Sequence, residues 1–329
     1  MAQERITSTR SIFTTAVLAV ALVGASLSAA AQTESAGGQV PAVNHNTWSS
    51  GTAMPTARFG PFTGAIGKNI YVVGGATNAQ YQTTAVNEIY STTKKKWTTG
   101  APDPTARALG ASAVVNGILY VIGGSNSGGD LNLVEAYDPV SNTWSTKASM
   151  PTPRNSMAAA VDKGVIYVIG GYNGGFLTTV ESYNTTTDTW AEEAPLLLAK
   201  AWQATGLLGG TIMAADGNIS APPGYTGDNE GYNVKKNKWT TLTADPTPRL
   251  EACFSVISGK LYVAGGWNGT LLGVNEAYSS TTKSWTTLAS MPNAVETPGS
   301  AVVGGRLYCI GGSNGNLSTV FNYVQIYQP

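Results

Sequence analysis

Histidine is almost absent from this chain of 329 residues, because His45 is the only one. A nucleophile triad that uses histidine as its base, or a metal site built from several histidines, needs such residues inside the folded domain. His45 lies at the start of the repeats described below. We therefore exclude both kinds of site from the repeats, and we expect neither a metal nor another cofactor.

Cysteine and charge are also scarce. Only Cys253 and Cys309 occur, which is too few for a cysteine-rich zinc site. Each lies in an apolar strand pattern, where cysteine usually packs as a small buried residue. We favour that interpretation, although an oxidising compartment would allow the two to form a disulfide. Charged residues make up 12% of the chain, and 19 basic residues balance 19 acidic ones. This balance argues against a nucleic-acid partner.

Long apolar runs are missing except near the N-terminus. Residues 12–27 are apolar apart from a few small residues, follow a weakly basic start and precede Ala29–Ala31, which fits a cleavage site. The run is short for a membrane span. We predict a cleaved signal peptide at residues 1–31, a flexible lead-in at 32–43 and an exported protein without a membrane span. An uncleaved anchor is the alternative.

Glycine is abundant, with 39 residues, and much of it lies in a repeat. An apolar strand that ends in two glycines occurs five times, and a sixth, altered copy ends at Asp216-Gly217. Internal periods of this kind identify repeat architectures. The five copies are Ile70–Gly75, Leu119–Gly124, Ile166–Gly171, Leu261–Gly266 and Leu307–Gly312.

Tryptophan and tyrosine keep a constant distance from these glycines. Each repeat tryptophan precedes the first residue of the next Gly-Gly, or Asp216, by 26 residues, and a tyrosine precedes five of these tryptophans by 7 residues. The tryptophans are Trp48, Trp97, Trp144, Trp190, Trp239 and Trp285. Six periods with these fixed offsets predict six copies of one structural unit.

Each period contains four short strand candidates separated by turn residues. In residues 155–190 we expect strands at Ser156–Val161, Val165–Ile169, Thr179–Tyr183 and from Thr189 onward. Four strands per unit with paired Gly, Tyr and Trp resemble the kelch-repeat family over residues 44–329. The resemblance implies an all-β fold, a six-bladed β-propeller.

The two ends of the repeat array complement each other. The last repeat stops at Pro329 without a tryptophan strand, whereas Trp48 has no blade of its own. We therefore expect the segment around Trp48 to supply the outer strand of the last blade, which would remove an open sheet edge. The propeller is expected to be a monomer.

A cation follows five of the six tryptophans by ten residues, in the connection between the outer strand and the next inner strand. These five residues are candidates for binding an anionic ligand at one mouth of the channel. A glutamate also precedes each of the five tyrosines by two residues, so pairing between cation and glutamate is the alternative. The blade with Val295 at the cation position has Gln325 at the glutamate position, which favours pairing. The cations are Arg58, Arg107, Arg154, Lys200 and Arg249.

Aromatic residues that break the repeat pattern are further ligand-binding candidates. Tyr172 and Trp267 directly follow Gly-Gly, and Trp202 follows Lys200. Exposed aromatics beside Asn and Gly suit sugar faces or peptide side chains. Among acids, Asp216, Asp228, Glu251 and Glu296 are conceivable, but no spacing rule pairs them. Glu251 beside Arg249 is the best local candidate for catalysis.

We favour a non-catalytic propeller that binds a glycan or a peptide or protein ligand. The site is expected on the face that carries the variable connections. The resemblance also implies alternatives: a sugar epimerase or mutarotase of the exported kelch type, acting on a sialic-acid-like substrate, or a structural partner in the cell envelope. Some kelch propellers resemble the copper enzyme galactose oxidase. That enzyme needs two histidines, so its activity is not expected here.

Overall fold

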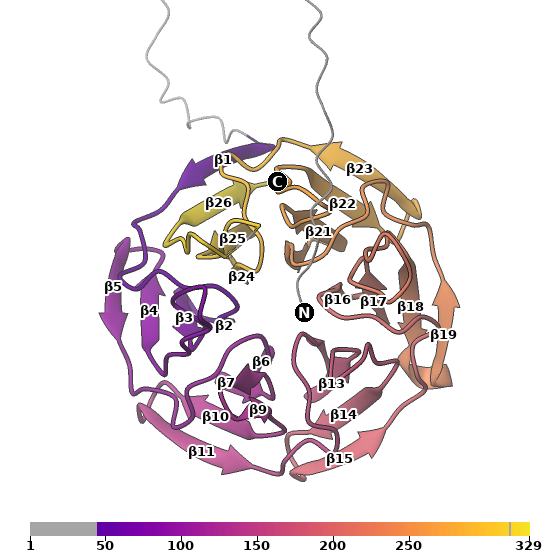
Figure 1. The fold of residues 1–329 in the computed structure, drawn as a ribbon. Coiled ribbons are helices and arrows are strands. Elements are labelled where there is room, and N and C mark those ends of the chain that lie inside the picture. Colours follow the sequence, from indigo (N-terminus) through magenta and orange to yellow (C-terminus); the bar gives the residue numbers. More distant parts are fainter. Residues whose placement is uncertain (1–44, 316) are drawn as a thin grey trace, which may run out of the picture. The chain divides into compact units, whose positions relative to one another are not determined.

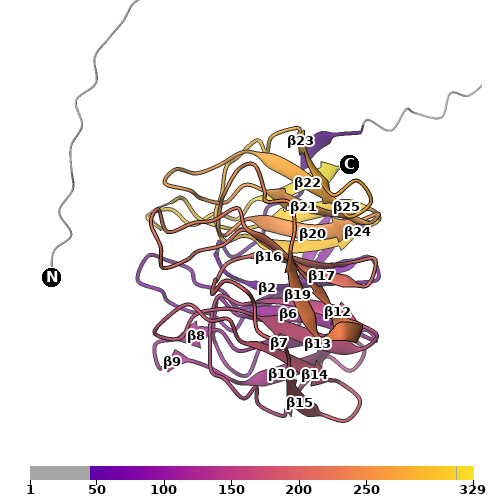
Figure 2. The same cartoon turned by 90° about the vertical axis from the view of Figure 1, so that its right-hand side faces the viewer.

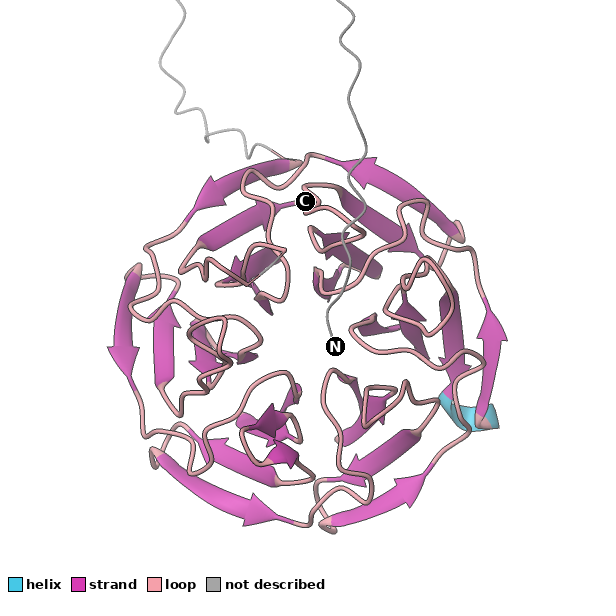
Figure 3. Ribbon diagram, in the orientation of Figure 1, coloured by secondary structure: helices cyan, strands magenta, loops and turns pink. Residues whose placement is uncertain are grey.

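The computed structural model describes residues 45–315 and 317–329, which form a ring of six four-stranded antiparallel sheets (Figure 1). The predicted signal peptide and lead-in, residues 1–43, lie outside the described residues. Nearly all regular structure is strand, with one turn of 3-10 helix, η1 at Val234–Lys236 (Figure 3). Within the described part, no helix is long and apolar enough to cross a membrane.

Each blade runs from an inner strand a beside the channel to an outer strand d at the rim. Blade 1 consists of β2 (Phe62–Ile66), β3 (Asn69–Val73), β4 (Asn87–Ser91) and β5 (Lys96–Thr99). Blade 2 consists of β6 (Ala111–Val115), β7 (Ile118–Ile122), β10 (Val134–Asp138) and β11 (Thr143–Lys147). Blade 3 consists of β12 (Ala158–Asp162), β13 (Val165–Ile169), β14 (Val180–Asn184) and β15 (Thr189–Glu192).

Blades 4 and 5 repeat this order, and blade 6 takes its outer strand from the start of the chain. Blade 4 consists of β16 (Ala204–Leu208), β17 (Thr211–Ala215), β18 (Asn229–Asn233) and β19 (Lys238–Thr241). Blade 5 consists of β20 (Cys253–Ile257), β21 (Lys260–Ala264), β22 (Asn275–Ser279) and β23 (Ser284–Leu288). Blade 6 consists of β24 (Gly299–Val303), β25 (Arg306–Ile310), β26 (Val324–Gln328) and β1 (Thr47–Ser50). In the b–c loop of blade 2, β8 (Ser125–Asn126) and β9 (Gly129–Asp130) project on one face of the ring (Figure 2).

The predicted closure is confirmed. β1 pairs antiparallel with β26, and Trp48 lies opposite Tyr327. Their ring centroids are 5.1 Å apart, and Nδ1 of His45 lies 2.6 Å from the carbonyl oxygen of Pro329. The first and last strands thus share one sheet, and β1 covers the edge that β26 would otherwise leave open.

The repeat tryptophans connect neighbouring blades at the rim. Each packs on the tyrosine of its own blade, as Trp97 does on Tyr90 with ring centroids 4.9 Å apart. Each indole N–H also donates to a backbone carbonyl just beyond the outer strand of the preceding blade. The bond from Trp97 to Thr52 is 2.9 Å long, and that from Trp48 to Ala289 crosses the seam at 2.7 Å. One side chain therefore fills the gap between blades and satisfies a backbone acceptor there.

Glycine allows close approach at two places in blade 1. A Cβ atom on Gly64 in strand a would lie 2.6 Å from the side chains of Leu119 and Val114 in the next blade. At the end of strand b, Gly74 has φ +62, and a Cβ there would lie 2.6 Å from the carbonyl oxygen of Arg107. Asp216 occupies the equivalent position of blade 4 with φ +64, a conformation that aspartate tolerates better than most residues.

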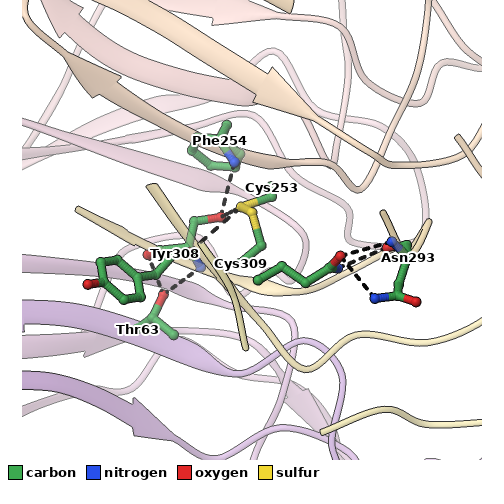
Figure 4. The surroundings of a disulfide bond; sticks show 8 residues. Thr63, Cys253, Phe254, Asn293, Tyr308 and Cys309 are labelled. Atoms are coloured by element: carbon green, nitrogen blue, oxygen red, sulfur yellow. Dashed lines mark hydrogen bonds between the residues drawn. A yellow bond between two sulfur atoms is a disulfide. The ribbon is translucent and has the colours of Figure 1, made fainter. Parts of the chain in front are cut away.

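A disulfide joins blades 5 and 6. Cys253 in β20 and Cys309 in β25 are bonded, with their Cα atoms 5.7 Å apart (Figure 4). Both residues are buried, at 0% and 1% exposure. The favoured interpretation, in which the two thiols only pack in the core, is therefore wrong. The ring places β20, the inner strand of blade 5, beside β25, the second strand of blade 6, and this brings the two cysteines together.

Candidate functional site

The structure places the five repeat cations inside their blades and not around the channel mouth. All five side chains are 0% exposed. The prediction that these cations form a ring at the channel mouth is therefore wrong. The structure shows the alternative, in which each cation pairs with a glutamate. The pairs are Arg58–Glu88 (2.7 Å), Arg107–Glu135 (2.6 Å), Arg154–Glu181 (2.6 Å), Lys200–Glu230 (3.3 Å) and Arg249–Glu276.

Burial explains why the cations need these partners. Desolvation lowers the pKa of Arg58 to about 10, so its guanidinium is still charged at neutral pH and needs a counter-ion. Blade 6 has uncharged residues at the two equivalent positions. Val295 packs in an apolar cluster, and the Gln325 side-chain amide donates to the Asn293 carbonyl at 2.9 Å. The one blade that lacks the cation thus also lacks the buried carboxylate.

The channel mouth is formed by a different set of residues, two positions after each of the five cations and after Val295. There, six equivalent residues have φ between 53 and 60, the left-handed region. Each backbone N–H donates to the carbonyl oxygen of the equivalent residue in the preceding blade, at 2.5–3.2 Å, and Gly60 to Thr297 completes the circle. We call this closed ring of six hydrogen bonds the collar. Its members are Gly60, Leu109, Ser156, Trp202, Glu251 and Thr297.

The collar also explains a difference from the predicted strands. Strand a of blade 3 begins at Ala158, whereas the sequence predicted Ser156. The left-handed backbone of Ser156 cannot continue a strand, so the strand starts after it. Strand b of the same blade, Val165–Ile169, lies where it was predicted.

Two cavities meet at the collar. One, the channel cavity, has a volume of about 420 Å³ and is lined by all six collar residues and by the inner strands. The other, the mouth pocket, has a volume of about 340 Å³. Four collar residues line both, and b–c loops complete the mouth pocket. The backbone bridge between Leu250 and Trp267 shows that the d–a and b–c connections share one face, as predicted.

Aromatic side chains form much of the mouth pocket: Phe59, Tyr81, Trp202 and Trp267 line it. The Tyr81 hydroxyl lies 2.6 Å from Ser125 Oγ, and its ring centroid is 6.1 Å from that of Phe59. Trp267 lies edge-to-face with Tyr225, centroids 6.3 Å apart. These contacts hold the rings in place before any ligand arrives.

Two carboxyl groups, Glu251 and Glu296, also line the mouth pocket, and they hydrogen bond to each other. Thr297 Oγ1 donates to Glu251 at 3.4 Å, and Ser313 Oγ donates to Glu296 at 3.3 Å. Burial first, and then the neighbouring Glu296, raises the pKa of Glu251 to about 8, and burial raises the pKa of Glu296 as well. The pKa of Glu296 is about 7, so near neutral pH the pair shares at least one proton and carries a partial negative charge that grows as pH rises.

Of the predicted ligand-binding residues, the structure brings Trp202 and Trp267 together in the mouth pocket. Tyr172 lines neither cavity, and its ring packs edge-on against Phe176, with centroids 5.4 Å apart. Tyr172 therefore does not join the other two predicted aromatics in the mouth pocket.

The candidate catalytic pair does not form either. Glu251 lines the pocket, whereas the Arg249 side chain is buried against Glu276 and Asp245. Of the other conceivable acids, Asp228 pairs with Lys200 at 3.0 Å, and Asp216 is buried beside Asp245 and lines neither cavity. Only Glu296 meets Glu251.

The sequence pattern did not single out Phe59, Leu109 or Thr297, whereas Tyr81 was recognisable as an aromatic residue in a long b–c loop. One signal was available, because the collar residues follow the cations at a fixed interval and differ in type from blade to blade. A position that keeps its place in the repeat but not its residue type faces something other than the neighbouring blade. In this chain it faces the channel.

Stability should depend on pH through the carboxyl pair. Because the folded pKa of Glu251 is raised from 4.5 to about 8, the folded state binds more protons than the unfolded state between these values, and stability falls as pH rises through this window. We expect Glu251→Gln to reduce the loss of unfolding free energy between about pH 5 and about pH 8 by about 1–2 kcal/mol.

Urea denaturation of both proteins at both pH values tests this expectation. Other buried carboxyls such as Asp103, whose pKa burial also raises, shift stability in the same direction, so the comparison between wild type and variant isolates the pair. An unchanged pH slope in the variant would contradict the shared proton.

Comparison with known proteins identifies kelch repeats in most of the chain. Residues 37–196 match the KLHDC2/KLHL20/DRC7 Kelch-repeats domain, and residues 248–292 and 297–329 match the Kelch motif. Among solved structures, the chain is similar to one titled "Structure of YjhT", with a TM-score of 0.73 and 19% sequence identity, over 84% of this chain and 96% of that chain. At this identity the likeness shows the fold.

Proposed function

The chain belongs to the kelch-repeat family, and on that premise we propose that it is an exported, monomeric, non-catalytic propeller that binds a glycan at the mouth pocket. The kelch propeller fold supports a protein-interaction or ligand-binding role in general. The observation that carries the choice of a glycan is the pocket itself. It combines aromatic walls, a volume of about 340 Å³ and hydrogen-bonding groups between them.

Each component suits a sugar. The flat rings of Trp202 and Trp267 offer stacking surfaces for the C–H faces of a pyranose. Glu251, Glu296 and Thr297 offer acceptors and a donor to its hydroxyl groups. A peptide is the second ligand class, but it would need acceptors and donors in an extended row, whereas these groups converge in one hollow.

The charges disfavour an anionic glycan. All five repeat cations are paired inside the blades, and the described residues that line the mouth pocket include no lysine or arginine. A sialic-acid-like carboxylate would meet Glu251 and Glu296 without a counter-ion. The proposal is therefore a glycan that is not anionic.

Export is part of the proposal, and two observations support it. The N-terminal segment has the composition of a signal peptide. The bond between Cys253 and Cys309 fits an oxidising compartment, where disulfides form and persist.

Replacing either pocket tryptophan should weaken glycan binding. We expect Trp267→Ala and Trp202→Ala each to lower affinity roughly 10–100-fold, because truncation of a central aromatic anchor commonly costs about 2 kcal/mol or more. Isothermal titration with a panel of neutral and amino-substituted tetrasaccharides measures the loss. Tyr172→Ala is the matched control, since Tyr172 also follows Gly-Gly on this face but lines neither cavity.

Two results would reject this function. Equal losses in the Tyr172 and Trp267 variants would mean that the mouth pocket is not the site. Anomeric exchange of a bound sugar in NMR spectra, abolished by Glu251→Gln, would instead favour the epimerase or mutarotase alternative, with the carboxyl pair as acid and base.

A further inference from the structure

We propose that the glycan bound in the mouth pocket carries a protonated amine, as in a 2-amino-2-deoxyhexose unit whose nitrogen is not acetylated. This inference rests on the proposed function and names its ligand class. It follows from the charge of the pocket, from the arrangement of its aromatic rings and from a donor without a partner.

The pocket carries one sign of charge. Among the described residues that line the mouth pocket and the channel cavity, Glu251 and Glu296 are the only charged ones. Any charge in the pocket is therefore negative and belongs to this pair, and an ammonium group beside it would stabilise its ionised form. A fully neutral sugar would leave this charge without a partner in a desolvated place.

The aromatic rings reinforce a preference for a cation. Tyr81, Trp202 and Trp267 line the same hollow as the carboxyl pair, and ring faces attract ammonium groups. The indole of Trp267 packs against Tyr225 on one side. Gly315 leaves room for it on another, because a Cβ there would lie only 2.9 Å from the Trp267 Cδ1 atom.

One donor in the wall indicates that something else binds there. The indole N–H of Trp202 is buried and has no hydrogen-bond partner among residues 45–315 and 317–329. The six rim tryptophans, in contrast, all donate to a backbone carbonyl. Orphaned buried donors are uncommon in folded proteins. Because this nitrogen is covered in the free protein, a ring or hydroxyl oxygen of the sugar would reach the Trp202 N–H only after the indole shifts.

The test compares three tetrasaccharides that share a β-1,4 backbone: the glucosamine tetramer, its fully N-acetylated form and cellotetraose. Titrations are run at several pH values between about 6 and about 8, because the carboxyl pair ionises in this range, with a pKa of about 7 for Glu296 and about 8 for Glu251. We expect the glucosamine tetramer to bind roughly 10–100-fold more tightly than the other two, because it alone makes a charge-assisted hydrogen bond. Added salt should reduce this preference.

The double variant Glu251→Gln/Glu296→Gln tests the assignment to the carboxyl pair. It should bind all three tetramers within about twofold of one another, and its melting curve shows whether it is folded. The single variant Glu296→Gln provides a second measurement if the double variant is unstable. Tyr172→Ala should keep the full preference for the glucosamine tetramer.

The possible failures are distinguishable. If cellotetraose or the N-acetylated tetramer binds wild type as tightly as the glucosamine tetramer, the amine is wrong and glycan binding stands. If no tetramer binds, the proposed function is wrong as well. Displacement of the glucosamine tetramer by an equal concentration of tetralysine would overturn the amino sugar in favour of a basic peptide.

Discussion

Replacing Arg154 by methionine should destabilise the propeller by about 3–5 kcal/mol, whereas replacing Arg154 and Glu181 together should cost much less. Methionine removes the counter-ion of Glu181, whose carboxylate then stays buried at 4% exposure with Thr152 as its remaining side-chain partner. Breaking a buried ion pair from one side leaves an uncompensated charge, which is why the expected cost is large.

The double variant Arg154→Met/Glu181→Gln removes both charges and keeps most of the volume. We expect it to lie within about 1–2 kcal/mol of wild type, because buried ion pairs can often be replaced by uncharged residues of similar size at little cost. Blade 6 shows that the fold accepts this solution. There, Val295 and Gln325 occupy the two positions, and the Gln325 side-chain Oε1 accepts from the Asn293 N–H at 2.9 Å.

Urea denaturation of wild type, both single variants and the double variant forms a complete cycle. The coupling between the two positions should exceed about 2 kcal/mol. A double variant as unstable as the sum of the single variants would show that the cations stabilise their blades by packing and backbone hydrogen bonds, and not by neutralising the glutamate.

Reduction of the disulfide should lower the free energy of unfolding by about 2–4 kcal/mol. Cys253 and Cys309 are 56 residues apart, so the bond restricts a long loop of the unfolded chain. It also joins blade 5 to the blade that the N-terminal strand completes. Denaturation with and without a reducing agent measures the effect.

The cysteine content of the sequence makes the effect of the reducing agent easy to interpret. Because Cys253 and Cys309 are the only cysteines, a reducing agent has no other thiol chemistry to act on. Cys253→Ala/Cys309→Ala should match the reduced wild type and should not respond to the reductant. Identical unfolding curves of wild type under both conditions would refute a stabilising bond.

The architecture was predictable from the sequence because its repeated residues have local structural requirements. Gly-Gly marks a backbone approach that a Cβ would obstruct, as at Gly74, and the tryptophans occupy equivalent places on the outer strands. The lone Trp48 and the missing final tryptophan predicted the closure for the same reason. Such requirements recur at fixed offsets, so a single sequence suffices to count the blades.

The candidate site was only partly predictable, because its residues share a position and not a type. The collar contains glycine, leucine, serine, tryptophan, glutamate and threonine in one backbone conformation, which no composition rule detects. Trp202 and Trp267 stood out as departures from the repeat, but the partner of Glu251 did not. Glu296 lies in the next blade, and only the curvature of the ring brings the two carboxyls together.

The closure through β1 has a consequence for the order of assembly. β1 emerges first during synthesis, yet its partner β26 is the last strand, and Asn46 and Tyr327 are 281 residues apart when they bond. Hairpins inside blades 1 to 5 need only short-range contacts and can form early, whereas pairing across the seam carries the loop-closure entropy of nearly the whole polypeptide. The ring can therefore close only after β26 has been synthesised, so blade 6 is the last blade to be completed.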